Sequence, residues 1–235
     1  MGPCCIQDIL EANGHFIDGL KFKGGSASLM PKNYYLKEIS DMVHQHGIYM
    51  STRNYAKHLL MKGPSAFKQY VQECKDIGFY MLELNGNLLN FQEDSVLRLI
   101  HLIRSEGLKA KSQLDVRIED ASSLKDLQKE MDAIIKKAKR FLEDGTDMIM
   151  FDVDGITKGV DEWRIDLVAK MIGQLGLQKI MFEADDPETV QWFVSKYGPR
   201  VNLFVDHSHV SRLECLRSST SWTGARGWGC SYLWL

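Results

Sequence analysis

LEDGTDMIMFDVD, residues 142–154, contains the pattern that decides the fold. A helical segment ends at Gly145, and an apolar run from Met148 to Phe151 follows within a few residues. Glycine suits this junction because it enters the left-handed conformation at a helix end without a Cβ clash. The apolar run lacks polar alternation, which indicates a strand buried on both faces. The pattern occurs six more times, at Gly14, Gly47, Gly78, Gly107, Gly176 and Gly198.

Between these junctions lie segments with the apolar spacing of helices, such as Val96, Leu97, Ile100 and Ile103. Alternating helices and short apolar strands, one crossover unit every ~22 to 38 residues, indicate a parallel sheet. We therefore predict a (β/α)8 TIM-type barrel, with a doubly wound open sheet as the rival. A closed barrel needs eight strands, whereas the sequence shows seven βα units. We expect the first strand to be missing or displaced.

The chain has two expected parts. Residues 1–217 carry the repeated units and are predicted to form a single barrel domain. Residues 218–235 combine tryptophan with serine, threonine and glycine and show no helical or strand period, so we expect an irregular tail. The amino terminus is expected to be truncated relative to complete barrels of this type.

Composition excludes several classes of protein. The chain has 235 residues, of which 44% are hydrophobic and 26% charged, as in globular proteins. Its formal net charge of -2 argues against a nucleic-acid partner or an anionic membrane partner. The 5 cysteines are scattered and odd in number, which favours a reducing compartment. No leader-like segment or membrane-length apolar run is evident, so we expect a cytoplasmic protein.

Polar residues close the apolar runs, where ligands bind in barrels and doubly wound sheets. The early runs end in cations and hydroxyls and the later ones in carboxylates, a combination suited to an anionic substrate and a hard divalent metal. The candidates are Lys21, Lys23, Gly24, Gly25, Ser26, Thr52, Arg53, Glu83, Lys111, Asp152 and Glu183.

Each candidate also has a plain structural interpretation. Lys21 is equally compatible with a lysine that extends its amine to solvent, and Gly24-Gly25-Ser26 with an ordinary turn rather than a phosphate cradle. Glu83 and Glu183 end apolar strands, where an unpaired carboxylate is costly. Metal ligation or ion pairing would explain them.

Several separated motifs together resemble the phosphosulfolactate synthase family, and most of all its plant branch, the heat-stress-associated proteins. The likeness covers about residues 6–217. The motifs are IDGLKFKGGSASLMPK (17–32), HQHGIYMST (44–52), GPSAFKQYVQECKDIGF (63–79), LKAK (108–111), DMIMFDVDG (147–155), KIMFEADDPE (179–188), YGPRVNLFVDHS (197–208) and LECLR (213–217).

The resemblance implies a (β/α)8 barrel and, in archaeal members, magnesium-dependent addition of sulfite to phosphoenolpyruvate. It implies catalytic roles for Lys21, Glu83 and Glu183, and magnesium ligation by Glu83, Asp152 and Glu183. Substrate-binding roles fall to Lys23, Gly24, Gly25, Ser26, Thr52, Arg53 and Lys111.

The sequence departs from the family at Arg53, where plant members usually have glycine, and at Glu119 and Asp120, where a catalytic lysine is expected. These departures favour a barrel that serves heat tolerance through a protein partner without robust synthase activity. The alternative is an active lyase for a small phosphorylated substrate. A third possibility is a barrel aldolase or isomerase for another sugar phosphate, whose Lys109 or Lys111 would form a Schiff base. A homo-oligomer is compatible with all three.

Overall fold

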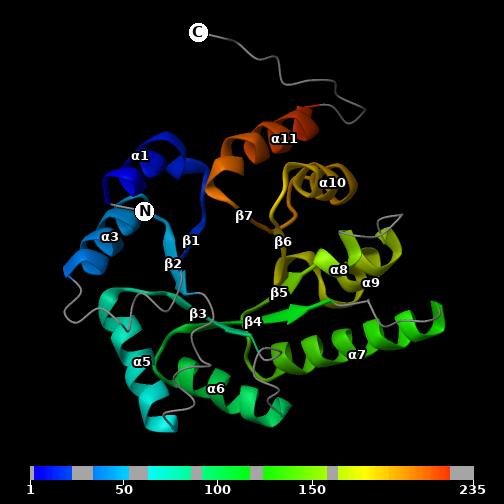
Figure 1. Ribbon diagram of the computed structural model, residues 1–235, viewed down its shortest axis with the longest axis horizontal. Helices are drawn as coiled ribbons and strands as arrows, with labels where there is room; N and C mark the ends of the chain where they lie inside the picture. Colours follow the sequence, from blue (N-terminus) through cyan, green and yellow to red (C-terminus); the bar gives the residue numbers. More distant parts are fainter. Residues whose placement is uncertain are drawn as a thin grey trace.

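The computed structural model describes residues 3–22, 34–52, 63–85, 92–116, 124–157 and 164–222. In these residues seven parallel strands form one curled sheet, each strand paired with the next along the chain (Figure 1). The strands are β1 (Gly19–Phe22), β2 (Tyr49–Thr52), β3 (Met81–Asn85), β4 (Lys109–Asp115), β5 (Met148–Asp152), β6 (Ile180–Ala184) and β7 (Leu203–Val205). This sequential order confirms the predicted TIM-type architecture with seven βα units, because a doubly wound sheet reverses its strand order.

Helices lie outside the curled sheet and cover its convex face (Figure 1). The longest, α7, has polar residues on its solvent side and buries Met131, Ile135 and Ala138. The α-helices are α1 (Pro3–Asn13), α3 (Tyr34–Gln45), α5 (Pro64–Ile77), α6 (Glu93–Ser105), α7 (Leu124–Glu143), α8 (Asp154–Thr157), α9 (Ile165–Leu175), α10 (Pro187–Tyr197) and α11 (Val210–Trp222). Short 3-10 turns are η1 (Gly14–Phe16), η3 (Leu177–Lys179) and η4 (His207–His209).

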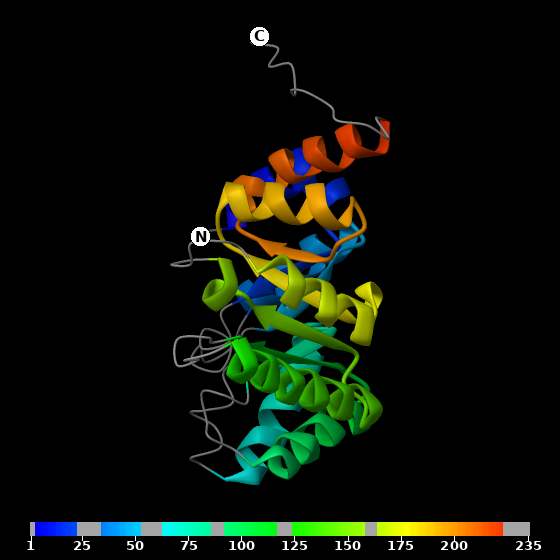
Figure 2. The same ribbon diagram turned by 90° about the vertical axis from the view of Figure 1, so that its right-hand side faces the viewer.

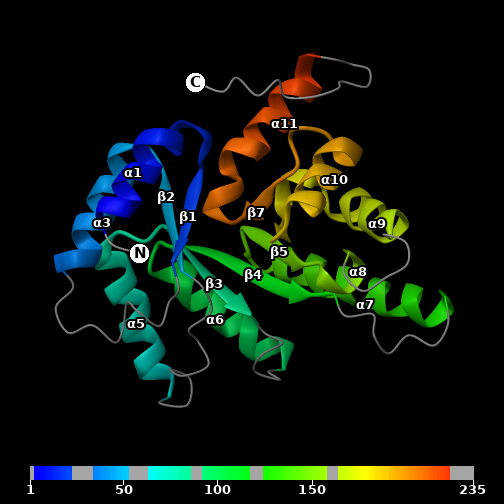
Figure 3. The same ribbon diagram turned by 45° about the horizontal axis from the view of Figure 1, so that its top comes forward.

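Side chains connect the two edges of the sheet, β1 and β7, which do not pair with each other in the described residues. The Nζ atom of Lys21 on β1 lies 4.4 Å from the ring centroid of Phe204 on β7. Outside the sheet, Ser211 Oγ donates a hydrogen bond to Asn13 Oδ1 at 2.6 Å. Figure 3 shows β1 and β7 facing each other across the opening of the curl. In the described residues the sheet is therefore curled but not closed by backbone pairing, and side-chain contacts bridge the gap between β1 and β7.

The predicted glycine junctions are largely confirmed. Six of the seven glycines have positive φ, namely Gly47, Gly78, Gly107, Gly145, Gly176 and Gly198. Gly78 has φ +108°, and a Cβ there would lie 2.4 Å from Ser40 Oγ, so this position requires glycine. The expectation was wrong for Gly14, which begins the turn η1 and lacks a positive φ.

Aromatic and aliphatic side chains fill the space between the sheet and the helices. Phe182 on β6 stacks on Phe151 of β5 at 6.0 Å and on Phe193 of α10 at 4.6 Å between ring centroids. All three side chains are fully buried. Offset aromatic pairs of this kind add stability beyond the area they bury.

Helices α10 and α11 pack together at the end of the molecule shown uppermost in Figure 2. Helix α11 extends to Trp222 and so includes the first residues of segment 218–235, whose remainder lies outside the described residues. The division of the chain at residue 217 stays a prediction. Within the described ranges, no helix combines the length and apolar character needed to cross a membrane.

Candidate functional site

Strand alternation directs one set of polar side chains into the concave interior of the sheet, here called the lumen. Leu82 and Leu84 on β3 belong to the core that packs beneath the helices. Because successive side chains of a strand point to opposite faces, Glu83 between them points into the lumen. Lys111 is its register partner on β4 and follows Ala110, which also lies in the outer core. Glu83 and Lys111 therefore face each other inside the curl.

Three charged side chains meet in the lumen, and we call them the lumen triad: Lys21, Glu83 and Lys111. The Oε2 atom of Glu83 lies 2.8 Å from Lys21 Nζ and 3.1 Å from Lys111 Nζ. The exposed fractions of these side chains are 4% for Lys21, 0% for Glu83 and 3% for Lys111. Thus the ion pairing predicted as one explanation for Glu83 is present.

The lumen triad carries more positive than negative charge. Two ammonium groups share one carboxylate oxygen, while Glu83 Oε1 accepts no hydrogen bond from the described residues. Buried charges are costly unless opposite charges balance them. A small anion entering the lumen would supply the missing negative charge, which makes the triad a candidate anion-binding site.

Burial lowers the pKa of Lys111 below the ordinary value of 10.5. The removal of its ammonium group from water is the largest cause. The carboxylates of Glu83 and Glu183 oppose this shift, and the positive charge of Lys21 adds to it. Lys111 therefore loses a proton more readily than a free lysine does.

Lys21 has a different environment from Lys111. Its Nζ atom lies over the ring of Phe204 and 3.8 Å from the sulfur of Met150 on β5. A cation over an aromatic face is stabilised in the charged form by the ring quadrupole. Lys21 thus contacts three strands besides its own: β3 through Glu83, β5 through Met150 and β7 through Phe204.

A second polar layer lies at the carboxyl ends of β3 to β6. Gln113 Nε2 donates to Glu183 Oε2 at 3.5 Å, and Asn85 Nδ2 donates to Asp115 Oδ1 at 3.4 Å. Asp152 is half-buried, and desolvation raises its pKa above 3.8, with further contributions from neighbouring carboxylates. A hydrogen bond from the backbone N–H of Asp154 opposes the rise. Glu183 and Asp152 occupy this layer, above the lumen triad.

The described residues do not fit a magnesium ion at Glu83, because both of its close contacts are ammonium groups on the same oxygen. Across the described ranges, no group of three or more His, Cys, Asp or Glu side chains could hold a metal ion. Magnesium prefers several oxygen ligands in octahedral geometry. Ligation by Asp152 and Glu183 stays a prediction.

Of the other predicted binding residues, Thr52 lies in the described part of the chain and the rest do not. Thr52 is buried at the end of β2, where its Oγ1 accepts a hydrogen bond from the backbone N–H of Glu83 at 3.3 Å. It therefore supports the strand that carries the triad carboxylate. Lys23, Gly24, Gly25, Ser26 and Arg53 lie outside the described residues. Their substrate-binding roles stay predictions.

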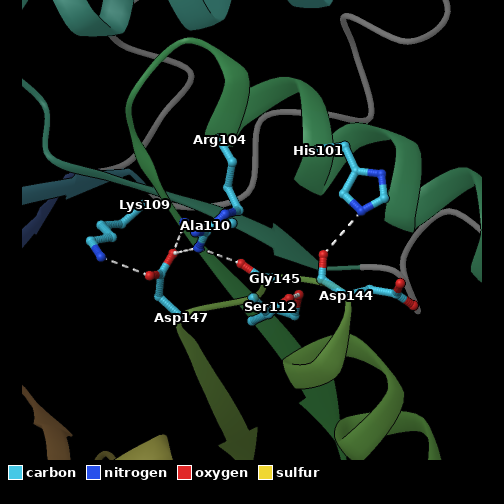
Figure 4. Close-up of polar contacts among 9 residues, drawn as sticks. His101, Arg104, Lys109, Ala110, Ser112, Asp144, Gly145 and Asp147 are labelled. Atoms are coloured by element: carbon cyan, nitrogen blue, oxygen red, sulfur yellow. Dashed lines mark hydrogen bonds and ion pairs between the residues drawn. The ribbon is translucent and has the colours of Figure 1, made fainter.

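A separate charged network lies at the opposite, amino-terminal edge of the strands (Figure 4). The carboxylate of Asp147 contacts Lys109 Nζ at 2.9 Å and Arg104 at 3.1 Å, and accepts a hydrogen bond from the backbone N–H of Ala110 at 3.0 Å. Arg104 also donates to the carbonyl oxygen of Gly145 at 2.8 Å. We call Arg104, Lys109 and Asp147 the edge network. Sequence reasoning did not name Asp147, although it directly precedes β5.

A surface pocket of about 580 Å³ lies between α1 and α3, away from the lumen. It contains none of the predicted site residues. Its lining is Gln7, Glu11, Lys37, Glu38, Asp41, Met42, Gln45 and His46.

Comparisons with known proteins identify relatives that match most of the chain. Residues 1–222 match the family described as (2R)-phospho-3-sulfolactate synthase (ComA). The chain is 46% identical over 230 residues to Protein HEAT-STRESS-ASSOCIATED 32 of Arabidopsis thaliana, covering 90% of this chain and 79% of that protein. It is 24% identical over 227 residues to Phosphosulfolactate synthase of Methanothermobacter thermautotrophicus, covering 92% and 84%.

Solved structures share the fold at low sequence identity. N-acetylneuraminate lyase from Mycoplasma synoviae has a TM-score of 0.56 at 9% identity, covering 93% of this chain and 68% of that one. The carboxyl transferase domain of Rhizobium etli pyruvate carboxylase has a TM-score of 0.55 at 12% identity, covering 82% and 33%. These likenesses concern architecture alone.

Proposed function

Because the chain belongs to the phosphosulfolactate synthase family, we propose that it acts in heat tolerance as a barrel protein of the plant heat-stress-associated type. The observation that carries this proposal is the 46% identity to Protein HEAT-STRESS-ASSOCIATED 32, against 24% to Phosphosulfolactate synthase of Methanothermobacter thermautotrophicus. In this role the barrel works through a protein partner and does not need robust synthase turnover.

The test is complementation of an Arabidopsis thaliana line that lacks this relative. We expect the wild-type chain to restore seedling survival after heat stress. Lys21→Ala, which removes a lumen cation, should restore it as well, provided that immunoblots show equal accumulation. Lys109→Ala, in the exposed edge network, is the matched control. Failure of the accumulated wild-type chain to restore survival would overturn the proposal, and selective failure of Lys21→Ala would count against partner binding without catalysis.

The lumen triad favours a second candidate, a lyase that adds sulfite to phosphoenolpyruvate. Two buried ammonium groups are suited to binding and stabilising anionic groups. When bound, magnesium would add Lewis-acid stabilisation of the developing negative charge. In the chain itself, Lys21 would orient the substrate anion, Glu83 would hold the two lysines in place, and Glu183 would lie at the mouth.

Enzymatic assays distinguish the lyase from the first proposal. Purified chain is incubated with phosphoenolpyruvate, sulfite and magnesium, and phosphosulfolactate is measured by mass spectrometry. A lyase predicts product formation that needs magnesium and falls in Lys21→Ala and Glu183→Ala but not in Lys109→Ala. Absence of product from a folded preparation would remove this candidate.

We also place the protein in the cytoplasm and expect a homo-oligomer. Cell fractionation tests the compartment, and size-exclusion chromatography with light scattering tests the assembly. Recovery in an organelle fraction, or a monomer at all concentrations, would contradict the respective expectation.

A further inference from the structure

The lumen triad has the parts of an amine nucleophile with its own proton carrier and anion site. Lys111 and Lys21 approach the same oxygen of Glu83 at 3.1 and 2.8 Å, and all three side chains are almost completely buried. We propose that Lys111 forms an imine with a small 2-oxo acid, with Glu83 as the proton carrier and Lys21 as the carboxylate-binding cation. This activity goes beyond the role in heat tolerance and does not depend on it.

Geometry separates the roles of the two lysines. Lys21 lies over the face of Phe204, an environment that favours an ammonium ion. Lys111 has no such aromatic contact among the described residues; its side chain is only 3% exposed, and its Nζ lies 3.1 Å from the Glu83 oxygen that Lys21 also contacts. A desolvated lysine beside a second cation is a recognised form of activated amine. Lys111 is thus the nucleophile and Lys21 the electrostatic anchor.

Imine formation balances with the groups present. Glu83 first takes one proton from the Lys111 ammonium, which leaves a neutral amine. Nζ of Lys111 then adds to the carbonyl carbon, an N–C bond forms, and the carbonyl electron pair moves to oxygen, which receives the proton from Glu83. Glu83 takes a second proton from nitrogen, giving a carbinolamine, and passes it to the hydroxyl, so that the C–O bond breaks and water leaves as the C=N bond forms. Lysine ammonium and 2-oxo acid become a protonated imine and water, Glu83 is again a carboxylate, and nothing is oxidised or reduced.

The lumen sets the class of substrate. Within the triad two lysines contact one glutamate, so the carboxylate of a 2-oxo acid would place a second negative charge beside them. Gln113 lies two residues further along β4 from Lys111, and Glu183 contacts it, so polar side chains cover the triad at the strand ends. Because the triad side chains are at most 4% exposed, we expect the site to take a short acid rather than a sugar chain. Pyruvate is therefore the appropriate probe.

The test is reductive trapping in the full chain. Folded protein is incubated at neutral pH with pyruvate and cyanoborohydride, which donates hydride to an imine and fixes the adduct as a secondary amine. Peptide mass spectrometry then compares Lys111 with Lys109, two residues away on the same strand and 44% exposed. We expect Lys111 to be modified first. Preferential modification of Lys109 and other exposed lysines, with Lys111 unmodified, would overturn the proposal.

Variants separate chemistry from folding. Lys111→Met should lose the fast adduct and Lys109→Met should keep it, with circular dichroism as the check on folding. If Lys111→Met does not fold, the comparison of the two lysines within the wild-type chain still decides the outcome.

The role of Lys21 has its own measurement. Lys21→Gln should raise the pyruvate concentration for half-maximal trapping about tenfold, the effect of losing one charged hydrogen bond. Trapping of acetone, which has no carboxylate, should not show this concentration shift. Equal pyruvate dependence in Lys21→Gln and wild type would refute the anchoring role.

Discussion

Two charge clusters, each containing one lysine of β4, join two cations to one carboxylate in different surroundings. The edge network joins Arg104 and Lys109 to the single carboxylate of Asp147, and the lumen triad joins Lys21 and Lys111 to the single carboxylate of Glu83. The ion pair of Asp147 raises the pKa of Lys109, whereas burial lowers the pKa of Lys111. Access to water is the difference between them.

This comparison separates structural from chemical roles. At the edge, solvent screens the surplus positive charge, and the lysine side chain is 44% exposed. In the lumen the three side chains are at most 4% exposed, so solvent screens the charge less, and burial, followed by the charge of Lys21, lowers the affinity of Lys111 for its proton. Two lysines on one strand can therefore differ in role: Lys109 is an exposed partner of Asp147, and Lys111 lies in the proposed imine site.

The largest expected loss of stability comes from a substitution that breaks the lumen triad. Glu83→Gln keeps the shape of the side chain but leaves two buried ammonium groups without a counter-charge. We expect a loss of about 3–5 kcal/mol in unfolding free energy, measured by urea denaturation. Adding Lys111→Met to this variant should recover part of the loss. A loss below about 1 kcal/mol for Glu83→Gln would show that the triad is well hydrated.

The second largest loss of stability is expected from a substitution that breaks the edge network. Asp147→Ala removes the partner of Lys109 and Arg104 and leaves the backbone N–H of Ala110 without its side-chain acceptor. We expect a loss of about 1–3 kcal/mol in the same urea experiment. The imine-trapping pattern should not change, since this network lies at the opposite ends of the strands. Loss of trapping in a folded Asp147→Ala protein would contradict the separation of the two clusters.

A smaller effect is expected in the pH dependence of stability, which reports on the buried lysine of the lumen triad. The pKa of Lys111 is lower in the folded chain than its ordinary value of 10.5, so the unfolded chain binds more protons between these two values. Stability contributed at this position therefore rises with pH across that window. Urea titrations should show the wild type gaining stability relative to Lys111→Met as pH increases. A relative loss would mean that pairing with Glu83 outweighs burial.

The smallest effect concerns Lys109 alone. Its amine is exposed, and Arg104 still pairs with Asp147 when it is removed. Lys109→Met should leave the thermal unfolding midpoint nearly unchanged in moderate salt. A marked drop in the midpoint, comparable with that of Asp147→Ala, would assign Lys109 a structural role as large as that of Asp147.

Local sequence signals were sufficient to predict the architecture. A glycine next to a short apolar run acts through a few neighbouring residues, so Gly78 and Gly145 marked their junctions without knowledge of the fold. Gly14 misled for the same reason, because a turn η1 replaces the expected left-handed end there. Strand order followed from the repetition of one unit.

The site was less predictable because its properties depend on distant residues. The position of Glu83 at the end of an apolar strand suggested ion pairing or metal ligation. That Lys21 and Lys111 share one of its oxygens could not be predicted, because the curl of the sheet brings their strands together. Asp147 was missed because its partner Arg104 is 43 residues away. Burial of Lys111 in the lumen lowers its pKa, and no local sequence pattern reports that burial.

The closure between the sheet edges has a consequence for biosynthesis. Each strand pairs with its immediate predecessor, so the sheet can grow as the polypeptide emerges from the ribosome. The hydrogen bond between Asn13 and Ser211 joins residues 198 positions apart and must wait for nearly all of the described chain. Lys21 likewise meets Phe204 only when β7 is present, so the unpaired edge of β1 stays uncovered in a nascent chain until β7 has formed.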